Sequence, residues 1–75
     1  MEISKEIATA WIERYEKLQS FYQYYLNKMD ESDDTESSEM YEMYADQYGY
    51  EMRGMNETLA IFGYSYSRGE ITKKD

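Results

Sequence analysis

The side chains available for chemistry in this 75-residue chain are mainly carboxylates, and they gather between Asp30 and Glu51. This segment holds nine acids and no Lys or Arg, so the whole net charge of −8 comes from it. The chain has no His and no Cys, which removes the commonest general base and the usual zinc ligands. Nothing in the pattern desolvates the acids as general acid catalysis requires. We therefore expect no catalytic residue, no cofactor and no enzyme activity.

The start of the acidic segment resembles a calcium-binding loop only in part. Asp30, Ser32 and Asp34 have the spacing of its first, third and fifth positions. The match then fails, because Thr35 stands where that loop needs Gly and Tyr41 where it needs a bidentate Glu. We expect no metal site, and we interpret the segment as a solvated turn.

An apolar seam before this segment predicts a long helix over residues 4–29. Its members recur at steps of three or four residues, the spacing of a helix face packed on another helix: Ile7, Trp11, Tyr15, Leu18, Tyr22, Tyr25 and Met29. Ser4 is placed to cap the N-terminus, and Glu6 in the first turn suits the helix dipole. Trp11 lies on the seam, so we interpret it as a core residue rather than as a binding anchor.

A second seam follows the turn and predicts a helix over residues 35–62. Its members have the same spacing: Tyr41, Tyr44, Tyr48, Met52, Met55, Leu59 and Phe62. Asp33 or Asp34 can cap this helix. Gly49 and Gly54 interrupt the pattern, but the seam keeps its phase across both. One continuous helix is therefore favoured, with two short helices broken near Gly49 as the alternative.

Together these elements predict an all-α domain, an antiparallel two-helix hairpin joined by an acidic turn at residues 30–34. Gly63 is placed to end the second helix, and residues 63–75 are expected to form a short extended tail, frayed from Arg68 onward. One hairpin buries little for a chain of this size, so we expect a homodimer, most simply a four-helix bundle. No apolar run is long enough to cross a membrane and no signal peptide is recognisable, so we expect a cytoplasmic location.

The candidate functional surface is the outer side of the second helix. At 100° per residue, its acids fall opposite the seam, and an apolar strip that includes Met43 and Tyr50 shares this outer side. The strip also contains Gly54 and Ile61, and it is either a partner site or the dimer interface. The ordinary interpretation of such acids is a solvated helix face. The candidate partner-binding residues are Glu36, Glu39, Glu42, Met43, Asp46 and Tyr50.

The charge predicts a basic protein partner and no direct binding to nucleic acid, whose phosphates the acids would repel. From Asp33 to Glu51, seven carboxylates lie along about 27 Å of helix, or one per roughly 4 Å. A DNA strand presents a phosphate about every 3.4 Å. The acids are therefore spaced like the ligand of a basic nucleic-acid channel.

In size, acidity, Tyr content and lack of His and Cys, the chain resembles small phage-encoded inhibitors, including acidic anti-CRISPR proteins and DNA mimics. The resemblance is compositional, involves no family motif, and covers the segment from Asp30 to Glu51 best. It implies inhibition of a nucleic-acid-binding host enzyme, such as a CRISPR effector. The alternatives are a structural or accessory helical protein whose acids keep it soluble, and an antitoxin or chaperone for a basic partner.

Overall fold

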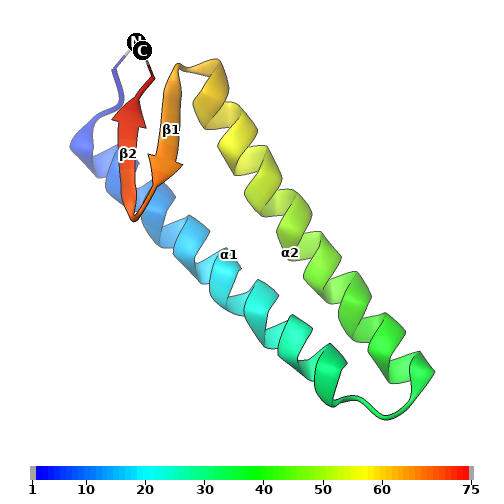
Figure 1. The fold of residues 1–75 in the computed structure, drawn as a ribbon. Helices are drawn as coiled ribbons and strands as arrows, with labels where there is room; N and C mark the ends of the chain where they lie inside the picture. Colours follow the sequence, from blue (N-terminus) through cyan, green and yellow to red (C-terminus); the bar gives the residue numbers. More distant parts are fainter. Residues whose placement is uncertain (1, 75) are drawn as a thin grey trace.

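The computed structural model describes residues 2–74, which form a long antiparallel helix pair with a small β-hairpin at one end (Figure 1). The elements in chain order are α1 (Lys5–Glu31), α2 (Thr35–Ile61), β1 (Tyr64–Ser67) and β2 (Glu70–Lys73). The predicted two-helix hairpin is therefore confirmed. The β-hairpin lies at one end of the helix pair, and the turn between the helices lies at the opposite end (Figure 1).

The helix ends follow the predicted capping chemistry. The Ser4 hydroxyl accepts a hydrogen bond from the backbone N–H of Ile7 at 3.2 Å. The turn is shorter than predicted, because α1 continues two residues further and leaves only residues 32–34 outside the helices. Asp34, not Asp33, caps α2 by accepting from the N–H of Ser37 at 2.7 Å. This bond lowers the pKa of the Asp34 carboxyl, because it stabilises the ionised form.

Helix α2 is continuous across both internal glycines, as the unbroken seam predicted. Gly49 has a packing reason, since a Cβ there would stand only 3.4 Å from the ring of Tyr22. Gly54 has no such neighbour within 4 Å, and its carbonyl accepts a hydrogen bond from the Thr58 hydroxyl at 2.9 Å. Gly63 ends the helix with a φ of 85°, the left-handed conformation expected for it.

The prediction of an extended, frayed tail at residues 63–75 is wrong for the part that the structure describes, which stops at residue 74. This segment forms an antiparallel hairpin in which Ser67 pairs with Glu70. Arg68 and Gly69 make the two-residue turn, with φ of 52° and 78°. Positive φ at both central residues is the pattern of a type I′ turn, whose twist matches that of the flanking strands.

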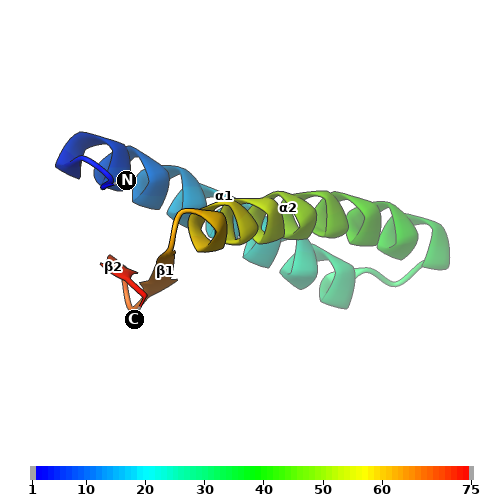
Figure 2. The same ribbon diagram turned by 90° about the horizontal axis from the view of Figure 1, so that it is seen from above.

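The β-hairpin covers one side of the helix pair at its open end (Figure 2). The Tyr66 ring packs on the rings of Trp11 and Tyr15, at centroid distances of 5.2 and 4.9 Å. The Tyr64 hydroxyl accepts a hydrogen bond from the N–H of Ile3 at 3.1 Å. Trp11 therefore packs against other rings but is only half-buried and lies outside the fully buried core, and the hairpin ties the N-terminal segment to the end of α2.

The core between the helices is thin. Among the described residues only Leu18, Ala45 and Leu59 are fully buried hydrophobic residues. The middle of the pair is filled by half-exposed tyrosines around Tyr25, whose ring lies 5.2 Å from that of Tyr44. Partial burial and the neighbouring tyrosines raise the pKa of Tyr25.

Three seam residues are less buried than their predicted core position requires. Ile7, Tyr44 and Phe62 each leave more than 40% of their surface exposed. Ala45, absent from the predicted seam, takes the buried position beside Tyr44. A small residue there suits the contact between the helices, so the tyrosine ring turns toward one side of the pair.

Candidate functional site

The four acids predicted to bind a partner all lie exposed on α2, opposite its buried side. We call this set, Glu36, Glu39, Glu42 and Asp46, the acidic face. A straight helix holds their side chains in fixed relative positions over about 15 Å, because each residue rises about 1.5 Å. The first of them stands in the first turn of α2, where a negative charge is favoured by the helix dipole.

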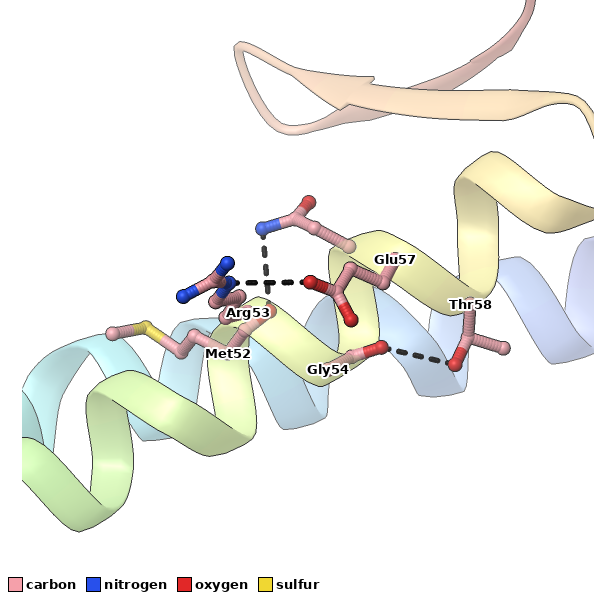
Figure 3. Close-up of polar contacts among 6 residues, drawn as sticks. Met52, Arg53, Gly54, Glu57 and Thr58 are labelled. Atoms are coloured by element: carbon pink, nitrogen blue, oxygen red, sulfur yellow. Dashed lines mark hydrogen bonds and ion pairs between the residues drawn. The ribbon is translucent and has the colours of Figure 1, made fainter.

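No base within residues 2–74 neutralises the acidic face. The ion pairs among residues 2–74 are Arg14 with Glu51, Lys28 with Glu31, and Arg53 with Glu57, and none of them includes an acid of the acidic face. Arg53 is the single base of α2, and its Nε lies 3.2 Å from Glu57 Oε1, one helix turn further along (Figure 3). The charges of the acidic face are therefore available to an external partner.

The structure shortens the array of seven carboxylates that the sequence suggested. The Asp34 carboxylate is occupied by its cap, and Glu51 points to another side of α2, where it pairs with Arg14 at 3.6 Å. The four carboxylates of the acidic face lie along about 15 Å of helix, which is again one per roughly 4 Å. This spacing is still close to the 3.4 Å repeat of phosphates along a DNA strand, but the row is shorter.

An exposed apolar strip runs beside these acids, as the helical spacing predicted. Met43, Tyr50 and Ile61 are 72%, 70% and 81% exposed, and we call these three residues the outer strip. Gly54, predicted to belong to it, instead borders a groove between the helices, and a Cβ placed there would have no neighbour within 4 Å. An exposed tyrosine and methionine among unpaired acids make a surface that can both attract and pack against a protein.

The described residues hold no cluster of metal-ligating side chains. No three acids among them come close enough together to hold a metal ion, and no side-chain polar atom is both buried and unsatisfied. Neither described helix is long and apolar enough to cross a membrane. The exposed carboxylates of the acidic face can supply long-range attraction and hydrogen-bond acceptors.

One feature of the surface was missed by the sequence reasoning. A groove of about 460 Å³ runs between the helices on the side away from the β-hairpin, lined by Trp11, Arg14, Leu18, Glu51, Gly54, Met55 and Thr58. The available signal was the spacing of seven residues that relates Ile7, Arg14 and Phe21, which places them along one side of α1.

Comparison of the chain with protein-family models, curated proteins and solved structures finds no match.

Proposed function

We propose that this protein is a small acidic binding protein that inhibits a basic nucleic-acid-binding partner, such as a CRISPR effector, through the acidic face of α2. The observation that supports this proposal is the row of four exposed, unpaired carboxylates on a single helix. Rigid acids without counter-charges attract a basic channel and accept hydrogen bonds from its Arg and Lys side chains. The outer strip adds apolar contact beside them.

The short length of the carboxylate row defines what kind of mimicry is proposed. A basic channel binds phosphates through flexible Lys and Arg side chains, so four acids at roughly 4 Å intervals can engage part of it without matching each phosphate. Occupation of the channel excludes the nucleic acid, which is inhibition by competition. Such a partner acts inside the cell, which is consistent with the cytoplasmic location expected from the sequence.

We also propose that the protein acts as a homodimer. The chain is 49 Å long but only 18 by 16 Å across. One helix pair therefore buries few side chains completely and leaves many apolar side chains partly exposed. A four-helix bundle would cover the exposed aromatic residues between the helices. It would also present two acidic faces to one partner, or one face to each of two partners.

The second candidate is an accessory helical protein whose acids only maintain solubility. The observation that favours it is the large exposed apolar surface away from the acidic face, which is typical of an assembly component. The two functions differ in one respect that can be measured, because only the first requires the carboxylates of α2 to contact a partner.

The experiment replaces Glu36, Glu39 and Asp46 with Lys, which changes the net charge by +6 and leaves the helix contacts intact. The assay follows displacement of a fluorescent DNA duplex from guide-loaded RNA-guided nucleases and other basic DNA-binding enzymes. The unmodified protein is expected to displace the duplex from at least one of them. The variant should lose this ability by about 100-fold or more, because like charges across an interface cost several kcal/mol.

A matched control separates position from net charge. Glu2, Glu13 and Glu16 are exposed and lie outside α2, and their replacement with Lys gives the same change of charge. This control should displace the duplex nearly as well as the unmodified protein. Equal losses in both variants would show that only net charge matters, and no loss in either would favour the accessory function.

A further inference from the structure

The β-hairpin leaves one side of the helix pair uncovered (Figure 2). A second group of exposed apolar residues lies on that side. Tyr15 marks the hairpin side of α1, because its ring contacts Tyr66 and its hydroxyl accepts a hydrogen bond from Asn56 at 3.0 Å. Arg14, one residue earlier, reaches Glu51 on the other side of the pair at 3.6 Å. The groove of about 460 Å³ is on this side as well.

Helical spacing assigns the other members of this surface. Residues seven apart share one side of a helix, so Ile7 and Phe21 lie on the side of Arg14, and Tyr44 lies on the side of Glu51. On α2, Met40 lies four residues before Tyr44, and Phe62 lies eleven residues, or about three turns, after Glu51, so both are on this side. We call the apolar residues of this surface, together with the groove, the open face: Ile7, Phe21, Met40, Tyr44 and Phe62.

The open face is large for an uncovered surface. Its five apolar side chains are between 40% and 62% exposed, which at about 200 Å² for each large side chain leaves roughly 470 Å² in contact with water. The whole chain has a surface of 5908 Å² for a mass of 9.1 kDa. A compact monomer of this mass would expose about 4,900 Å². The difference of about 1,000 Å² is close to the area that each partner loses in a standard protein interface.

Charge distinguishes the open face from the outer strip as a site for a second copy. In a twofold dimer each patch meets its own equivalent, so a patch of one charge sign repels itself. The outer strip lies among Glu39, Asp46 and Glu57 and would bring like charges together. The charged pair at the centre of the open face, Arg14 and Glu51, is already neutral in sum.

We propose that the open face is the surface on which a second copy of this chain docks. The open faces of the two copies would pack against each other and leave the acidic faces and β-hairpins outside the interface. The inference locates the self-association proposed above and does not depend on the identity of the acidic face's partner. Residues seven apart on both helices give the regular repeat that packs well in a four-helix bundle. The groove beside Trp11 would then receive side chains of the other copy.

The test introduces Ile7→Glu and Met40→Glu together, both near helix N-termini, where added acids do not oppose the helix dipole. The matched control is Met43→Glu with Tyr50→Glu on the outer strip, which adds the same charge and avoids the C-terminal end of α2. Sedimentation equilibrium should report a dimer for the unmodified protein at about 10 µM. The dissociation constant should rise by about 100-fold or more in the open-face variant and by less than about threefold in the control.

A second measurement needs no substitution. Trp11 is the single tryptophan and lines the groove, so its emission should shift to longer wavelength when the dimer is diluted. An unmodified protein that is monomeric at about 100 µM would overturn the inference. Dissociation of the outer-strip control variant alone would also overturn it, and so would a dimer whose Trp11 emission does not change on dilution. If the Lys variant of α2 still displaced DNA while the dimer data held, the proposed inhibition would fail and this inference would stand.

Discussion

At the scale of single residues, the side chains of the turn and of α2 divide between building the helix and facing outward. Asp34 is used internally, because its carboxylate caps α2 at Ser37. Glu51 is held by Arg14, and Glu57 by Arg53. The acids of α2 without an ion pair are the four of the acidic face, so folding and the proposed function use different carboxylates of the same acidic segment.

The capping role of Asp34 predicts a specific response to acid. Its pKa is lowered in the folded state by the hydrogen bond from the N–H of Ser37. The carboxylate therefore stabilises the fold above its unfolded pKa, and this stabilisation is lost as the pH falls through the folded pKa. The melting temperature of the unmodified protein should therefore fall between neutral pH and about pH 3. The fall should be smaller in Asp34→Asn, because the amide oxygen still accepts the hydrogen bond but does not titrate.

The control for this residue is its neighbour. Asp33→Asn removes one charge from the same turn but leaves the cap in place, so its acid profile should match that of the unmodified protein. An identical reduction in both variants would show that the charge of the turn, and not the cap, determines the response.

At the scale of elements, the helices were predictable because each end has a local chemical signal. Ser4 and Asp34 are good N-caps, Gly63 suits a left-handed end, and the seams maintain helical phase between them. The predicted boundaries differ from the observed ones by two residues or fewer. Exposure of the acids was predictable for the same reason, since helical phase alone places them opposite the seam.

The β-hairpin was missed because its second strand is short and has a single apolar residue, Ile71. The turn residues Arg68 and Gly69 were its available signal, but Arg is uncommon at a positive φ. The open face was missed because seam spacing gives the mean direction of the core and not the tilt of each ring. Tertiary packing decided that Ala45 would be buried and that Tyr44 would turn outward.

The contact between the β-hairpin and α1 gives a stability prediction. Tyr66→Ala removes ring contacts to Trp11 and Tyr15, and aromatic pairs are worth about 0.5–1.5 kcal/mol each beyond their burial. We expect a loss of about 1–3 kcal/mol in denaturant unfolding followed by Trp11 emission. Tyr50→Ala, on the exposed outer strip, should stay within about 0.5 kcal/mol of the unmodified protein. Equal losses would mean that the β-hairpin does not stabilise the helices.

At the scale of the whole molecule, the helix pair separates two kinds of surface. The open face is apolar and locally neutral, whereas the outer side of α2 is acidic and has no bases except the paired Arg53. A dimer formed through the first leaves the second accessible. The proposed attraction to a basic partner and the proposed association with another copy would therefore not compete for the same residues.

The salt dependence of inhibition tests the central claim most directly. For a nuclease that the protein displaces from DNA, the inhibition constant is measured over a range of salt concentrations. The comparison is between the unmodified protein and a variant with Gln at the three glutamates of the acidic face and Asn at Asp46. Neutral side chains of the same shape remove attraction without adding repulsion, so we predict weaker inhibition and a shallower dependence on salt. Inhibition of equal strength and equal salt dependence in both proteins would contradict the claim.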